Sequence, residues 1–291
     1  MTEFDSTYQP VNQSTYQPFN QSTNQLINYT LHQADNTLIL GHRNSEWTGH
    51  GPILEQDIAI SNIALDLIGQ SRNFYQYAAQ LINESNPNSS PNGGGREGAV
   101  GTASEDSLAY LRDGWDFKNC LLVEQTNGDW AKTILRQFLF SNYQYLLYEA
   151  LLKSEDQTIA AISEKSLKEV TYHLRWSSEW VIRLGDGTEE SHRRMLLAID
   201  DLWKFTGELF EPAEYEKQAA KAGIGTDISL LKSRWQQITD QVFEQATLPK
   251  PSLANEGWNR TKGKEGQHTE HLGYILAEMQ FLQRAYPGCE W

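Results

Sequence analysis

Apolar residues recur at every third or fourth position through most of the chain, which is the spacing of one buried face of an α-helix. The clearest case follows Pro52, which suits the first turn of a helix because it has no backbone N–H to satisfy there. We therefore expect a long helix to begin near this proline. Its predicted buried stripe comprises Ile60, Ile63, Ala64, Leu67, Ile68, Phe74, Tyr75 and Ala78.

Residues 129–153 are apolar almost all round. Such a helix is either central in a bundle or faces both a core and a partner subunit. Elsewhere the apolar spacing and the turn signals predict helices over 157–184, from about Thr188 onward, over 227–247 and over 268–285. Strand-like alternation bounded by turns is not convincing anywhere, so the sequence predicts an all-α helical bundle.

Two segments lack the helical pattern. Residues 6–25 repeat with a period of eight (STYQPVNQ, STYQPFNQ, STNQ). This polar, proline-punctuated repeat cannot bury enough surface to become ordered, so we expect residues 1–25 to form a disordered tail. Residues 84–104 contain three consecutive glycines and have the composition of a flexible linker. We expect them to form an insertion within a helical domain of residues 26–291.

The charge balance excludes some partners. The chain has 24 Lys and Arg against 38 Asp and Glu, a net charge of −14, which disfavours binding to nucleic acid. No run approaches the roughly 20 apolar residues that span a bilayer, and the N-terminus lacks the order of a signal peptide. Cys120 and Cys289 form neither a metal knuckle nor a disulfide framework. We expect a cytoplasmic protein with no membrane partner.

Helical bundles often hold two metal ions with Glu-x-x-His pairs, whose spacing puts both ligands on one inward face. Two such pairs occur here, Glu189 with His192 and Glu265 with His268. Both matches are weak because neither pair lies in an apolar stripe: helix capping explains Glu189, and Glu265 comes before its helix begins. Glu149, Glu169 and His173 are further candidates within predicted helices.

Several longer runs resemble a known family, the paired A and C subunits of bacterial ring 1,2-phenylacetyl-CoA epoxidase, and most closely its C subunits. The resemblance covers about residues 28–83 and 105–291. The runs that carry it are SEWTGHGP at 45–52, EQDIA at 55–59, NIALDLIGQ at 62–70, DSLAYLR at 106–112, LVEQ at 122–125, NGD at 127–129, RQF at 136–138, KEVTYHLR at 168–175, RLGDGTEESHRR at 183–194 and HTEHLGYILAEMQ at 268–280.

The resemblance implies a ferritin-like fold with additional C-terminal helices. In that family a di-iron centre lies in the A subunit, which epoxidises the aromatic ring of phenylacetyl-CoA with O2. A B subunit and a reductase that uses NADPH, FAD and an iron–sulfur cluster complete the enzyme. The C subunit is a paralogue that pairs with the A subunit, with two copies of each in a heterotetramer, and is not itself the oxygenase.

The metal ligands of the A subunit are replaced in this sequence. Its second helix reads Asp-Glu-Ala-Gly-His where this chain has Asp66 to Gln70, so Leu67 and Gln70 stand at the Glu and His positions. Its Lys-Glu-Glu-Ser-Phe-His becomes Lys168 to His173, so Val170 replaces the Glu and only His173 is kept. The two remaining carboxylate positions fall near Asn36-Thr37 and Ser141-Asn142. The resemblance therefore implies a vestigial metal site, with no catalytic residue and no cofactor in this chain.

Three hypotheses follow from these observations. The first is a structural subunit that binds the catalytic paralogue, with Tyr143, Tyr145 and Tyr148 at the interface, although core packing explains these tyrosines equally well. The second is a di-iron oxygenase or ferroxidase that uses Glu189/His192 and Glu265/His268. The third is retained binding of coenzyme A without a metal. The residues that would then contact its phosphates are Arg175, Arg183, Arg193 and Arg194.

Overall fold

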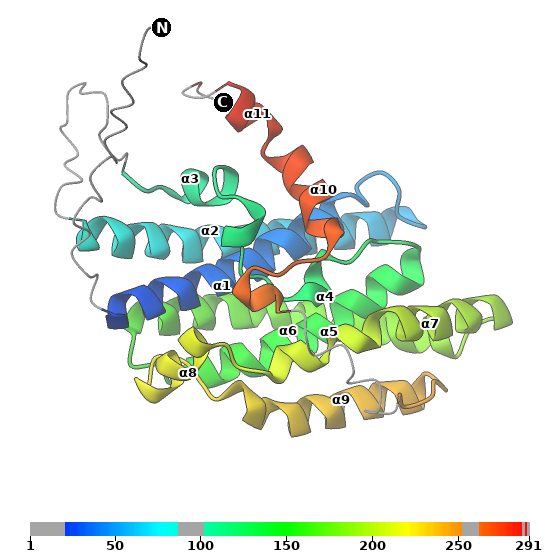
Figure 1. Ribbon diagram of the computed structural model, residues 1–291. Helices are drawn as coiled ribbons and strands as arrows, with labels where there is room; N and C mark the ends of the chain where they lie inside the picture. The colour runs from blue at the N-terminus through cyan, green and yellow to red at the C-terminus, as the bar shows by residue number, and fades with distance from the viewer. Residues whose placement is uncertain (1–20, 87–101, 252–261, 287–288, 290–291) are drawn as a thin grey trace, which may run out of the picture.

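Four long helices form the centre of the molecule (Figure 1). The computed structural model describes residues 21–86, 102–251, 262–286 and 289, and within these ranges it contains helices and loops but no strand. The all-α prediction is therefore confirmed. Consecutive long helices pack against each other as two hairpins, the first with the second and the third with the fourth. The four helices are α1 (Gln21–Ser45), α2 (Leu54–Ser85), α5 (Trp130–Leu151) and α6 (Gln157–Gly185).

The apolar spacing places these helices correctly. The predicted stripe on α2 is buried except for Ile68, which is half-buried. The α5 helix is buried almost all round because α6, α7 (Glu189–Leu202) and α9 (Lys232–Gln245) all pack against it. At its N-terminus the Asp129 side chain accepts a hydrogen bond from the backbone N–H of Lys132, which satisfies one of the free donors of the first turn.

One long connection joins the two hairpins. It runs from α2 to α5 and contains α3 (Glu105–Tyr110), a short 3-10 turn η1 (Gly114–Asp116) and α4 (Leu121–Glu124). A bundle with a single crossover of this kind is ferritin-like, as expected. The expected insertion at 84–104 begins inside α2 and ends at the N-cap of α3, and its residues 87–101 lie outside the described ranges.

The α1 helix is a difference from the sequence analysis, because it begins at Gln21 within the segment assigned to the tail. Residues 1–20 of that segment lie outside the described ranges. Apolar spacing did not reveal α1 because many of its inward side chains are polar. The buried polar residues of α1 are Thr30, His32, Gln33, Asp35, Asn36, Thr37, Arg43 and Asn44.

Shorter helices surround the bundle (Figure 1). The helix expected over 227–247 is a 3-10 turn followed by α9, and the one expected over 268–285 is divided into α10 and α11. In the described part of the chain, no helix combines the length and the apolar character needed to cross a membrane. The remaining elements are η2 (Trp203–Phe205), η3 (Gly207–Phe210), α8 (Glu214–Lys221), η4 (Ile228–Leu231), η6 (Gly263–Glu265), α10 (Glu270–Met279) and α11 (Phe281–Ala285).

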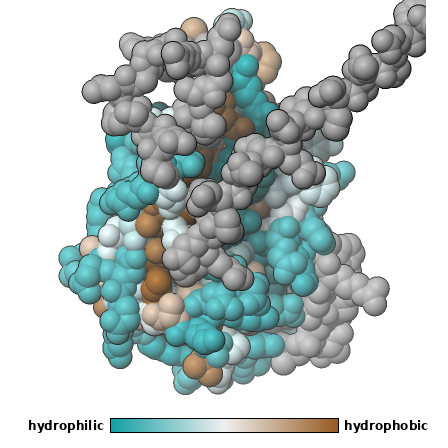
Figure 2. Space-filling model, turned by 60° about the vertical axis from the view of Figure 1, so that its left-hand side comes forward, coloured by the Kyte–Doolittle hydropathy of each residue, from teal (hydrophilic) through white to brown (hydrophobic). Residues whose placement is uncertain are grey.

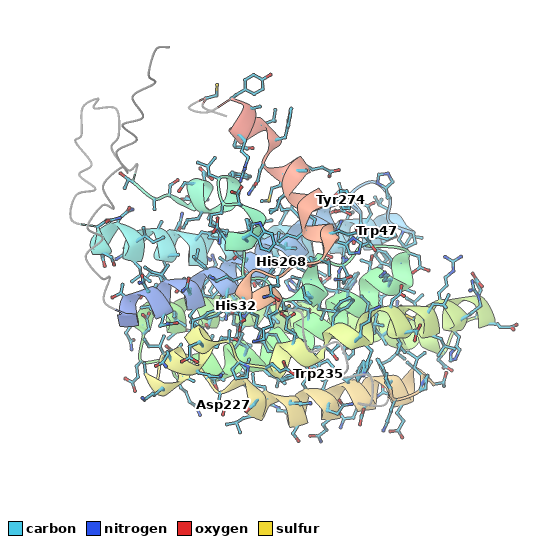
Figure 3. All side chains as sticks on the ribbon, viewed as in Figure 1. His32, Trp47, Asp227, Trp235, His268 and Tyr274 are labelled. Carbon is cyan, nitrogen blue, oxygen red and sulfur yellow. The ribbon has the colours of Figure 1, made fainter. Side chains whose placement is uncertain are left out.

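Buried charged groups hold residues 262–269, which we call the C-terminal clamp, against the crossover and α8. The carboxylate of Glu124 accepts hydrogen bonds from the backbone N–H and the hydroxyl of Thr269, both at 2.7 Å. It also lies 2.8 Å from Nδ1 of His268. Figure 3 labels His268. The Lys264 ammonium, only 3% exposed, donates to the carboxylate of Glu216 at 3.1 and 3.2 Å. These bonds position α10 beside η1 and α4.

Most of the surface is hydrophilic. On the face shown in Figure 2, teal residues cover most of the described surface, and brown hydrophobic residues are visible in a narrow band and a few isolated places. Single exposed apolar residues are normal for a folded protein, whereas a group of them on one helix requires an explanation.

The His268–Glu124 contact should make stability depend on pH. Burial lowers the pKa of His268, but the hydrogen bond and the charge of Glu124 outweigh it, so the pKa lies above its usual value of 6.5. A raised pKa in the folded state stabilises the protein fully below about pH 6.5, and the stabilisation falls as pH rises through the folded pKa. We expect His268→Gln to reduce the free energy of unfolding by about 1–3 kcal/mol at pH 6 and by less at pH 8.5.

Urea denaturation at both pH values measures this difference. The matched control is His271→Gln, three residues along the same segment and half-buried. A loss of stability in His268→Gln that is equal at the two pH values would contradict the prediction.

Candidate functional site

The positions related to metal ligands lie inside the bundle, on the facing sides of α2 and α6. Leu67, Val170 and His173 are fully buried, and Gln70 is only 1% exposed. Hydrogen bonds from Gln70 and His173 cross between the two helices. The structure therefore brings together the four residues that the sequence analysis selected, two from each helix.

His173 is held by a carboxylate from the opposite helix. Its Nε2 lies 2.9 Å from Oδ2 of Asp66 on α2, whose side chain is 38% exposed. Its Nδ1 is buried and has no hydrogen-bond partner among the described residues. A histidine with one ring nitrogen fixed by a carboxylate and the other pointing inward is the arrangement of a metal-ligating histidine and its supporting carboxylate. The neighbouring side chains determine whether such a site can form.

Amide and hydroxyl groups fill the space beside His173. Gln70 donates to Oε2 of Glu169 at 2.8 Å and accepts a 3.0 Å hydrogen bond from Gln144 on α5. Gln144 also donates to the hydroxyl of Tyr148 at 3.0 Å. Burial raises the pKa of Glu169 above its usual value. This network joins α2, α5 and α6 with mostly uncharged groups, although Oε1 of Gln144 has no hydrogen-bond partner among the described residues.

The other two ligand positions bond to neighbouring elements. Asn36 accepts a 2.8 Å hydrogen bond from the backbone N–H of Cys120 in the crossover. Asn142 donates to the carbonyl oxygen of Trp235 on α9 at 2.9 Å. Thr37 donates to carbonyl groups of its own helix, and Ser141 accepts from Gln137. All four therefore contribute to packing between or within helices.

These side chains do not fit a di-iron centre. Two ferrous ions in a bundle require several carboxylate oxygens that bridge them. The inward positions here offer one imidazole, amides and two aliphatic side chains. Across the described ranges, no three His, Cys, Asp or Glu side chains are grouped so that they could hold a metal ion.

The two Glu-x-x-His pairs occupy separate places in the fold. Glu189 is exposed at the start of α7, and Nδ1 of His192 lies 2.6 Å from the carbonyl oxygen of Gly185 at the end of α6. Glu265 forms a 3.1 Å ion pair with Lys262, while His268 belongs to the C-terminal clamp. The structure does not bring the two pairs together into one site.

Two of the three tyrosines considered for the interface lie inside this chain. Tyr143 and Tyr148 are buried inside this chain, and Tyr145 is half-buried. The ring of Tyr143 packs edge-on against Phe210, and the hydroxyl of Tyr148 bonds to Gln144. Core packing, the alternative considered for these residues, is therefore correct for Tyr143 and Tyr148. The apolar surface of α5 is covered by this chain's own helices.

The four arginines considered for coenzyme A make local contacts. Arg193 and Arg194 both pair with Glu190, at 2.9 and 2.8 Å. The guanidinium groups of Arg175 and Arg183 lie over the rings of Tyr172 and Trp180. The structure brings only Arg193 and Arg194 together, on the exposed side of α7.

Sequence reasoning did not identify the buried charges that join distant segments of the chain. Asp35 pairs with Arg112 and accepts a 2.7 Å hydrogen bond from the backbone N–H of Lys118. Burial raises the pKa of Glu208 to about 7, although its carboxylate accepts backbone hydrogen bonds from Leu121 and Lys264. These partners are distant in sequence, so no spacing pattern reveals them.

Comparison with known proteins agrees with the motifs. The family model described as phenylacetic acid catabolic protein matches residues 7–291. The C subunit of the 1,2-phenylacetyl-CoA epoxidase of Escherichia coli (strain K12) is 45% identical over 257 residues, which cover 88% of this chain and 95% of the relative. The resemblance drawn from the sequence is thereby confirmed. The chain belongs to the family of phenylacetic acid catabolic proteins.

Proposed function

We propose that this chain is the non-catalytic, structural C subunit of a ring 1,2-phenylacetyl-CoA epoxidase that acts in aerobic phenylacetate catabolism in the cytoplasm. It pairs with a paralogous A subunit that carries the di-iron centre, in a heterotetramer with two copies of each chain. A B subunit and a reductase with NADPH, FAD and an iron–sulfur cluster complete the enzyme. The similarity to the epoxidase C subunit of Escherichia coli supports the assignment to this enzyme.

The main support for the proposal is the kind of side chain that stands at the former ligand positions. Leu67 and Val170 are fully buried, and each buried aliphatic side chain contributes roughly 1.5–3 kcal/mol to folding. Gln70 bonds to partners on α5 and α6. An interior filled in this way is stable without a ligand. A subunit of this kind supports its partner by presenting a rigid surface.

The retained pair of Asp66 and His173 has a structural role in this proposal. It joins α2 to α6 across the seam between the hairpins. One imidazole supported by a carboxylate leaves the remaining coordination positions of an iron ion unfilled. Oxygen activation therefore belongs to the A subunit, and this chain takes part in the reaction only through its contacts with that partner.

Iron loading tests the proposal directly. After anaerobic incubation with Fe(II) and desalting, we expect elemental analysis to give close to zero iron per chain. We also expect the chain to co-purify with the A subunit in equal amounts. About two irons per chain would contradict the proposal.

A carboxylate restored at a ligand position should destabilise the bundle. We expect Val170→Glu to lower the free energy of unfolding by about 3–5 kcal/mol more than Val170→Gln at pH 8, because only the glutamate buries an unpaired charge. The difference should shrink at pH 5, where the glutamate binds a proton. Urea denaturation of both variants measures it, and equal stability at pH 8 would contradict the prediction.

A further inference from the structure

The outer side of α2 carries large apolar residues in its N-terminal half. Leu54, Ile58 and Leu65 are 72%, 51% and 69% exposed. Their spacing of four and seven residues places them on one line of the helix, opposite the buried stripe. Gly69 continues this line, and a Cβ atom added there would meet no other atom within 4 Å. We call Leu54, Ile58, Leu65 and Gly69 the outer stripe.

The C-terminal half of the same side is polar and bonds to the crossover. Arg72 and Gln76 contact the carboxylate of Glu105 on α3, at 3.5 and 3.0 Å. Asn83 exchanges two 2.9 Å hydrogen bonds with the backbone of Ala103. The side of α2 is therefore polar where it bonds to the crossover and apolar in its exposed N-terminal half. An exposed apolar region next to a polar region on one helix is typical of a docking surface for another molecule.

The shape of the outer stripe indicates what covers it. It extends over 15 residue steps, or about 22 Å, along a straight helix. A narrow apolar line of this length fits the apolar side of a second helix, and the glycine at its end permits close approach. We propose that the outer stripe docks against a helix of the paralogous A subunit, an inference that rests on the function proposed above.

Charge favours that partner over a second copy of this chain. Glu55 and Asp66 are separated by three helical turns, so they lie on the same flank of the outer stripe, near its two ends. An antiparallel pair of identical helices would place Glu55 of one copy beside Asp66 of the other. Each copy also carries a net charge of −14. The partner helix therefore carries an apolar stripe of about four turns with cationic side chains along the flank that meets these carboxylates.

Binding of full-length proteins tests the docking surface. The variant Leu54→Ser/Leu65→Ser is compared with Leu197→Ser/Leu230→Ser, whose leucines are 55% and 74% exposed on α7 and η4. We expect the first variant to bind the purified A subunit about a hundredfold more weakly, since truncation of each buried anchor costs about tenfold. The control should bind within about twofold of the wild type. Both variants should keep the thermal stability of the wild type because the replaced side chains are exposed.

The outcomes separate the two proposals. If the wild type does not bind the A subunit, the proposed function fails and the docking surface fails with it. If the wild type binds and Leu54→Ser/Leu65→Ser binds equally well, the docking surface alone is wrong. Sedimentation of the isolated chain adds a further test. A dimer that Leu54→Ser/Leu65→Ser converts to a monomer would identify a second copy as the occupant and overturn the inference.

A charge variant tests the partner's chemistry. We expect Glu55→Lys to weaken binding to the A subunit about fivefold at low salt and less at high salt, where screening reduces the attraction. Tighter binding by Glu55→Lys would overturn the cationic character assigned to the partner helix.

Discussion

The contacts between α2 and α6 help to align the two helical hairpins, together with the hydrogen bonds from Asn44 to Gln137 and from Gln144 to Gln70. Each hairpin brings its own helices together through a short connection, but only contacts across the seam can fix the register of one hairpin on the other. Two of these contacts are polar and cross the seam at adjacent turns, His173 with Asp66 and Gln70 with Glu169. A polar group buried without a partner would destabilise the fold, so these pairs specify one alignment.

The same seam holds Leu67, Gln70, Val170 and His173, the positions that the resemblance relates to metal ligands. A metal centre joins helices through bonds from several ligands to one group. Here Leu67 and Val170 supply apolar contact, while amide groups supply directional bonds. A metal centre and these apolar and amide contacts can each hold α2 against α6. In the proposed function, this replacement removes the metal chemistry and keeps the packing of α2 against α6.

Buried charges have a comparable role outside the bundle. Glu124, Glu216 and Lys264 lie where the crossover, α8 and the C-terminal clamp meet, and none of these elements is long enough to be stable alone. Each charge has a partner inside the chain, so the clamp forms only when all three segments are in place. The outer stripe of α2 is the opposite case, because its apolar side chains have no such partner among the described residues.

The sequence by itself determined the helical class and most of α2, α5, α6 and α7, and it selected Leu67, Gln70, Val170 and His173, which the structure brings together between α2 and α6. These features depend on local spacing or on aligned motifs, and both are contained in the order of residues. It did not identify α1, because polar inward residues conceal the apolar period, and it left open whether Tyr143 and Tyr148 lie in the core or at an interface. An apolar helix has the same pattern whether its own chain or a partner covers it. Only the tertiary structure decided which distant residues pair, such as Asp35 with Arg112. It also decided that Leu54 and Leu65 are exposed. Contacts between distant segments leave no periodic signal in the sequence.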